Sequence, residues 1–89
     1  MNFAVKKIEF EFEENTSTSK KVSFYSLFEI ALKKYASKTA FKLEEEGIEF
    51  NKELSFITVA KVLKKLAKAG FFIKEIEYEA DGTVEVEIE

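Results

Sequence analysis

Apolar and acidic residues alternate near the start of the chain. Over Ile8–Glu13 every second residue is apolar and the residues between are glutamate, a period of two that predicts a strand buried on one face. Phe3 and Val5 are apolar at odd-numbered positions, whereas the apolar residues of Ile8–Glu13 are at even-numbered positions, and Lys6–Lys7 separates the two patterns. A bulge at Lys6–Lys7, or a later start of the strand, would bring the two phases into agreement.

The next pattern is helical and follows a polar loop at Asn15–Ser19. Ser26 and Glu29 have the spacing of a capping box, which predicts a helix that begins at Ser26, and Tyr25 and Ile30 would form its hydrophobic staple. The apolar stripe with the 3.6-residue period consists of Phe24, Leu27, Phe28, Ala31, Leu32 and Tyr35. The residues expected to face water are Lys33, Lys34 and Lys38.

A second helix is predicted to begin after Ser55, a candidate N-cap, with Leu54 and Val59 as its staple. Gly70 stands where a left-handed residue ends a helix, and Phe71 would then close back onto the last turn. Its expected apolar stripe consists of Phe56, Val59, Ala60, Leu63, Leu66 and Ala67.

The C-terminal residues predict a hairpin whose register depends on its turn. A two-residue turn at Asp81–Gly82 would place apolar and acidic side chains on the same face. A three-residue loop, Ala80–Gly82, with Gly82 left-handed, instead pairs Tyr78 with Val84 and keeps the apolar residues together. We therefore favour the three-residue loop.

Residues Thr39–Phe50 are compatible with a helix or a strand. A helix would hold Glu44–Glu46 in its last turn, where negative charge opposes the helix dipole. A strand would alternate Phe41 and Leu43 with charged residues, leaving Gly47 as a bulge or loop residue, and we favour it. The resulting fold is one α+β domain over residues 1–89. It is a two-layer sandwich of order βαβαββ, with a four-stranded mixed sheet and two helices on one face. A winged helix with an extra N-terminal strand is the alternative.

The composition removes several kinds of chemistry. The 89 residues contain no Cys, His, Pro or Trp, and neither Arg nor Gln occurs, so all 14 basic residues are lysine. Disulfides, thiolate metal sites and histidine bases are therefore excluded. Such a restricted alphabet, with a surface charged almost entirely by Lys and Glu, resembles that of computationally designed or redesigned small α+β proteins. That resemblance implies a folding scaffold with no intrinsic activity.

The predicted layout also resembles two nucleic-acid-binding families. Val5–Ile8, the Phe41–Gly47 segment, Leu63–Leu66 and the Asp81–Gly82 hairpin resemble the C-terminal domain of translation initiation factor three and the archaeal chromatin protein Alba, which share a topology. Thr58–Phe71 is similar to the recognition helix of a winged helix-turn-helix module. Both resemblances imply nucleic-acid binding. The residues that would bind are Lys61, Lys64, Lys65 and Lys68.

Glutamates form the most distinctive expected surface. If the apolar residues of the first and last strands face the helices, the opposite sheet face carries Glu9, Glu11, Glu13, Glu75, Glu77, Glu79, Glu85, Glu87 and Glu89. This face is interpreted as a solvated surface, a cation site, a mimic of nucleic acid or a binding surface for a basic protein. We expect no catalytic, cofactor-binding or metal-binding residues, because serine lacks a histidine partner and no Gly-rich loop is present.

The remaining expectations concern partners and location. No apolar run is long enough to span a membrane and no signal peptide is recognised, so we expect a soluble protein of cytoplasmic type. The expected state is a monomer with no partner, no cofactor and no membrane association, and a nucleic acid or a basic protein is the alternative partner.

Overall fold

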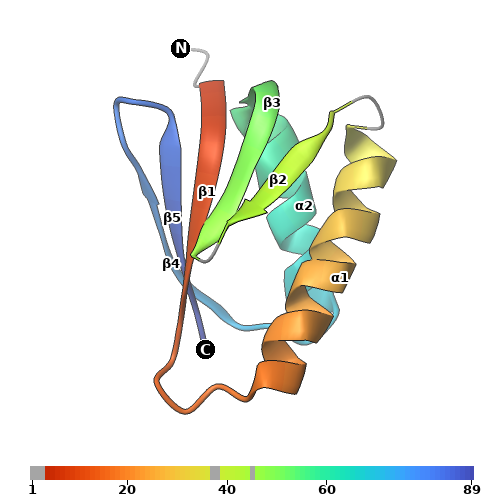
Figure 1. Ribbon diagram of the computed structural model, residues 1–89, viewed down its shortest axis with the longest axis vertical. Coiled ribbons are helices and arrows are strands. Elements are labelled where there is room, and N and C mark those ends of the chain that lie inside the picture. The colour runs from red at the N-terminus through yellow and green to blue at the C-terminus, as the bar shows by residue number, and fades with distance from the viewer. Residues whose placement is uncertain (1–3, 37–38, 45) are drawn as a thin grey trace.

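Five strands form one mixed sheet, and two helices pack against one face of it (Figure 1). The computed structural model describes residues 4–36, 39–44 and 46–89. In chain order the elements are β1 (Ala4–Phe12), α1 (Thr18–Tyr35), β2 (Phe41–Glu44), β3 (Gly47–Ser55), α2 (Phe56–Lys68), β4 (Ile73–Tyr78) and β5 (Thr83–Ile88). The predicted α+β class is confirmed.

The sheet has the spatial order β2-β3-β1-β5-β4. β1 runs parallel to β5, whereas the β1–β3, β2–β3 and β4–β5 pairs are antiparallel. The first and last strands of the chain therefore lie side by side in the middle of the sheet. The mixed sheet with both helices on one face was predicted, but the predicted number of four strands is wrong, because the described residues form five.

The additional strand comes from the segment that the sequence left ambiguous. Residues 39–50 do not form one strand: β2 ends at Glu44 and the chain returns as β3, with Phe41 opposite Phe50. The winged-helix alternative is wrong because it requires a helix where β2 lies. Gly47 begins β3 at a close approach to β1, where a Cβ would overlap the carbonyl oxygen of Ile8. Gly47 is therefore a pairing residue rather than a bulge or loop residue.

The start of α1 also differs from the prediction. Its N-cap is Ser17, whose side chain accepts a hydrogen bond from the amide of Lys20 over 3.2 Å, so Ser26 lies inside the helix and caps nothing. The predicted staple fails because Ile30 is 65% exposed. A real capping box pairs the cap with Glu or Gln three residues on, and Lys20 occupies that place. The signal at Ser17 was therefore weaker than the coincidental match at Ser26.

Within α1, four residues of the predicted stripe are buried, namely Phe24, Phe28, Ala31 and Leu32. Leu27 is half-buried and Tyr35 is exposed. Lys33 and Lys34 face water as expected, and Lys38 lies outside the described residues.

Other local predictions are confirmed. The register of β1 against β3 shifts between Val5 and Lys7, which is the predicted bulge. Ser55 caps α2 by accepting from the amide of Thr58. At the other end of α2, Gly70 has a φ of 104°. Its amide donates to Ala67 and that of Phe71 donates to Leu66, the two bonds of a Schellman motif.

The core lies between the sheet and the two helices and contains no buried polar or charged residue among those described. Phe10 of β1 packs edge-to-face against Phe24 and Phe28 of α1, with ring centroids 4.8 and 5.4 Å apart. The buried residues of α2 are Val59, Val62, Leu63 and Leu66. Its stripe is therefore rotated toward Val62, with Phe56 and Ala67 on the exposed side. The helices thus leave the opposite face of the sheet open.

Candidate functional site: an acidic sheet face

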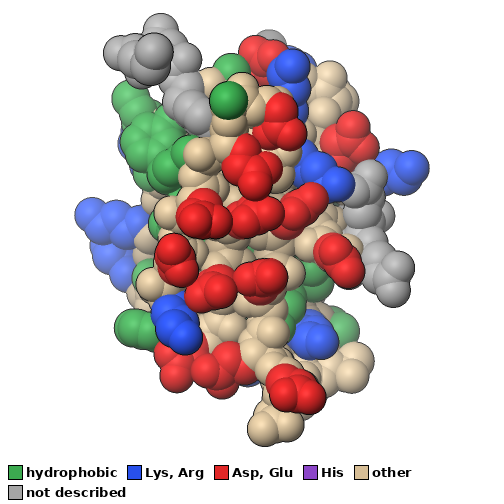
Figure 2. Space-filling model, turned by 90° about the vertical axis from the view of Figure 1, so that its left-hand side faces the viewer, with side chains coloured by type: hydrophobic (Ala, Val, Ile, Leu, Met, Phe, Trp, Pro, Cys, Tyr) green, Lys and Arg blue, Asp and Glu red, His purple; other side chains and the backbone are tan. Residues whose placement is uncertain are grey.

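The open side of the sheet carries two rows of carboxylates across three neighbouring strands. In one row Glu77 of β4 lies opposite Glu85 of β5, and Glu85 lies beside Glu9 of β1. In the next row Glu75, Glu87 and Glu11 follow the same strands. We call these six residues the acidic face. Figure 2 shows this side of the molecule with acidic side chains gathered over the middle of the sheet.

The pattern arises because three strands with the same alternation are in register. The three-residue loop is confirmed: Tyr78 pairs with Val84, and Gly82 has a φ of 92°. Asp81 fixes the loop by accepting a 2.9 Å hydrogen bond from the amide of Thr83. Neighbouring strands are about 4.8 Å apart, so partner carboxylates lie within repulsive range of one another.

The other half of the same sheet face has alternating charges. Lys42 of β2 lies opposite Glu49 of β3, and Glu49 lies opposite Lys7 of β1. Lys7 also reaches Glu9, with Nζ 3.5 Å from Oε1. Cross-strand pairs of opposite charge stabilise a sheet, so the β2–β3–β1 half is balanced and the β1–β5–β4 half carries a concentrated negative charge.

Glu85 is the group whose ionisation this crowding changes most clearly. Repulsion from the carboxylate of Glu79 raises its pKa above the usual value of 4.5, and desolvation and the neighbouring Glu77 and Glu9 add to the increase. Asp81 behaves in the opposite way, because hydrogen bonds from Thr83 lower its pKa. The raised pKa of Glu85 therefore reflects mainly like-charge repulsion at the hairpin end of β5.

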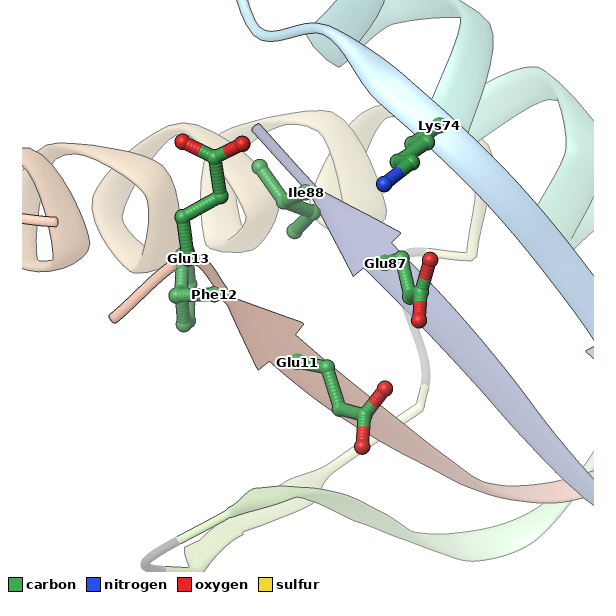
Figure 3. A pocket seen from close by; sticks show the side chains of 6 residues that line it. All are labelled: Glu11, Phe12, Glu13, Lys74, Glu87 and Ile88. Atoms are coloured by element: carbon green, nitrogen blue, oxygen red, sulfur yellow. The ribbon is translucent and has the colours of Figure 1, made fainter. Parts of the chain in front are cut away.

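Two hollows mark the acidic face. The larger, about 340 Å³, lies at the C-terminal ends of β1 and β5 and is lined by Glu11, Phe12, Glu13, Lys74, Glu87 and Ile88. Figure 3 shows Glu11 and Glu87 pointing the same way from adjacent strands, while Lys74 extends from β4. The smaller, about 200 Å³, is lined by Glu9, Phe10, Glu11, Glu46 and Glu85. Both hollows are therefore lined by glutamates of the acidic face.

The carboxylates lie in rows instead of converging on a point. Within residues 4–36, 39–44 and 46–89, no group of three acidic side chains is placed to hold a metal ion. An extended array of this kind matches an extended cationic ligand better than a single ion, because divalent cations require several oxygens at one centre.

The four lysines singled out for nucleic-acid binding are all exposed on α2. Lys61, Lys64, Lys65 and Lys68 have the spacing that places side chains on one side of a helix. They belong to the helical layer, whereas the acidic face belongs to the sheet.

The sequence predicted that Glu9, Glu11 and the glutamates of the C-terminal hairpin share one face of the sheet, but it did not predict that β1 lies beside β5. Glu9 and Glu11 join the rows through the parallel pairing of β1 with β5, which connects residues more than 70 positions apart. The available signal was the matching alternation of Ile8–Phe12 and Val84–Ile88, which places apolar residues of both strands on one face.

Comparisons with known proteins gave no relatives. No protein-family model matches the chain, and searches of curated proteins and of solved structures returned no match. Neither described helix combines the length and hydrophobicity needed to cross a membrane.

Proposed function

We propose that this chain is a folding scaffold that performs no reaction of its own and that binds basic polypeptides through the acidic face. The observation that carries the binding proposal is the pair of carboxylate rows, Glu77–Glu85–Glu9 and Glu75–Glu87–Glu11. Like charges on neighbouring strands destabilise a sheet by a few tenths of a kcal/mol or more per pair. A polycation would relieve that repulsion, so its binding and the stability of the fold are coupled.

The proposal that the chain is a scaffold is supported by the apolar composition of its interior. No polar or charged residue among those described is buried, whereas acid–base and nucleophilic catalysis rely on groups whose pKa is tuned by burial and fixed neighbours. The raised pKa of Glu85 arises on an open sheet face, mainly from Glu79. The fourteen-letter alphabet of the chain favours a designed origin.

Nucleic-acid binding is the second candidate. It is favoured by the exposure of Lys61, Lys64, Lys65 and Lys68 on one side of α2. Lysine neutralises phosphate as a point charge but lacks the bidentate geometry of arginine. The acidic face also repels a phosphate backbone, so the geometry supports a basic polypeptide better.

The test is a titration of fluorescein-labelled octalysine, followed by anisotropy in about 0.05 M NaCl, where exposed charges are weakly screened. The double variant Glu77→Gln/Glu85→Gln should weaken binding about tenfold, since each exposed charge contributes about threefold. The control Glu14→Gln/Glu29→Gln changes the net charge equally away from the acidic face and should retain most of the affinity.

Two results would overturn the proposal. One is the absence of octalysine binding, and the other is equal weakening by the two double variants. A labelled DNA duplex titrated in parallel measures the second candidate directly. DNA affinity above octalysine affinity, lost in Lys61→Gln/Lys65→Gln, would replace our proposal with nucleic-acid binding.

A further inference from the structure

We infer that β4 is a docking edge that accepts an extended segment of alternating basic and apolar residues as a sixth strand of the sheet. This inference rests on the proposed function and specifies how the acidic face holds its partner. Adding a strand to an exposed edge supplies backbone hydrogen bonds for affinity, and side chains on alternate faces supply specificity.

The position of β4 is the first support. β4 stands at the end of the order β2-β3-β1-β5-β4 and has β5 as its only neighbour among the described strands. In an antiparallel ladder, residues that exchange hydrogen bonds alternate with residues whose backbone groups point outward. The amide of Glu79 donates to Thr83 over 2.9 Å. Residues 79, 77 and 75 therefore direct their backbone groups toward β5, and the residues between them direct theirs away from it. Ile76 is one of the residues between, so its backbone amide and carbonyl point toward the outer edge.

The two sides of β4 differ in chemistry, which is the second support. Glu75, Glu77 and Glu79 are exposed on the side of the acidic face. On the helical side Ile76 is half-buried, and Tyr78 is 40% exposed although its ring packs 4.8 Å from that of Phe56. A strand placed against β4 would meet carboxylates on one side and partly covered apolar groups on the other. Its side chains must therefore alternate between basic and apolar.

Charge argues against a second copy of this chain as the occupant. Two β4 strands side by side would bring their glutamates onto the same face of a continuous sheet, and like charges in partner positions are destabilising. Edge strands in natural proteins use such charges to prevent self-association. A basic segment turns the same charges into attractive pairs.

The opposite edge lacks this complementarity. β2 carries Lys42 on the half of the sheet where charges alternate, opposite Glu49 of β3. β2 thus contains one lysine and one glutamate, Lys42 and Glu44. β4 and the residue after it carry three exposed glutamates, Glu75, Glu77 and Glu79, against one lysine, Lys74. The β4 edge is therefore the more acidic of the two and suits a basic partner better.

The first experiment compares two acetylated octapeptides of equal composition. One consists of four lysine–valine repeats, and the other repeats two lysines followed by two valines. Only the first separates charge from apolar groups on the two faces of a strand. It should bind at least tenfold more tightly, and amide hydrogen exchange should slow at Ile76.

The second experiment tests whether the peptide binds beside β4, using two variants in the same carboxylate row. Glu75 lies on β4, whereas Glu11 lies two strands further in, about 10 Å away, which is one Debye length in 0.1 M salt. Glu75→Gln should weaken binding of the alternating peptide about fivefold, and Glu11→Gln should weaken it less.

The outcomes separate this inference from the proposed function. If octalysine and both octapeptides bind equally, or if Glu11→Gln weakens binding as much as Glu75→Gln, the acidic face binds by charge alone and the edge inference is wrong. If no basic peptide binds, the proposed function fails as well. A concentration-dependent dimer that slows exchange at Ile76 without peptide would make a second copy the occupant and overturn the inference.

Discussion

Glu9 of β1 and Glu85 of β5 occupy partner positions in a parallel ladder, on the sheet face that the helices leave open. The chain could have placed a lysine at either position, as it does where Lys7 lies opposite Glu49. Instead, two strands from opposite ends of the sequence bring like charges together. The acidic face is therefore a product of tertiary pairing, and its energetic consequences can be measured.

Salt should stabilise the fold. Screening weakens the repulsion within the carboxylate rows, so the urea midpoint should rise between about 0.05 and 0.5 M NaCl. Salt also weakens the attractive ion pairs Lys6–Glu53, Lys7–Glu9 and Glu29–Lys33, whose N–O distances are 3.1 to 3.5 Å. These pairs are exposed or nearly so, and exposed ion pairs contribute little to stability. A midpoint that falls with added salt would show that these attractive pairs dominate.

Replacing Glu85 with glutamine should stabilise the protein at pH 7. Folding raises the pKa of Glu85, so the folded state favours the protonated carboxyl group. The stability that this protonation contributes is complete below the unfolded pKa and is lost as the pH rises through the folded pKa. The wild type should therefore gain stability as the pH falls from 7 toward the ordinary carboxyl pKa of 4.5, and Glu85→Gln should reduce that gain. Urea midpoints at both pH values measure it. If the variant kept the pH dependence of the wild type, Glu85 would not be the source of that dependence.

Gly47→Ala should destabilise the protein by about 3 kcal/mol, near the upper end for overpacking, because the added Cβ meets the backbone carbonyl of Ile8. Gly70→Ala is the comparison. Its Cβ would contact nothing within 4 Å, but its φ of 104° costs about 1 kcal/mol for a residue with a side chain. Urea unfolding gives both values. A smaller loss for Gly47→Ala than for Gly70→Ala would contradict the close approach of β3 to β1.

Ser17→Ala and Ser26→Ala test where α1 begins. Loss of the Ser17 cap, which accepts from the amide of Lys20, should cost about 1 kcal/mol of unfolding free energy. Ser26 is exposed within the helix, so its replacement should change stability by less than about 0.5 kcal/mol. The reverse order would restore the helix start expected from the sequence.

The features that the sequence predicted correctly depend on residues close together in the chain. The cap at Ser55, the left-handed Gly70 and the three-residue loop ending at Gly82 each follow from a few neighbouring side chains. The return of the chain from β2 to β3 was missed because the sequence Glu44–Gly47 contains no Asn-Gly or Asp-Gly pair, the usual mark of a tight hairpin.

The acidic face was only partly predictable for a related reason. Alternation within β4 and β5 indicated the opposition of Glu77 and Glu85, which a short loop fixes. The addition of Glu9 required knowing that β1 pairs with β5, a long-range parallel contact that strand patterns alone leave open. The charge rows became visible only once that pairing was known.

The most direct test of the central claim is a ¹⁵N amide NMR titration of the wild-type protein with octalysine in about 0.05 M NaCl. Our account predicts shift changes within β4, β5 and β1, the three strands of the acidic face, that are reversed by added salt. Shift changes centred on α2, or no changes at all, would contradict it.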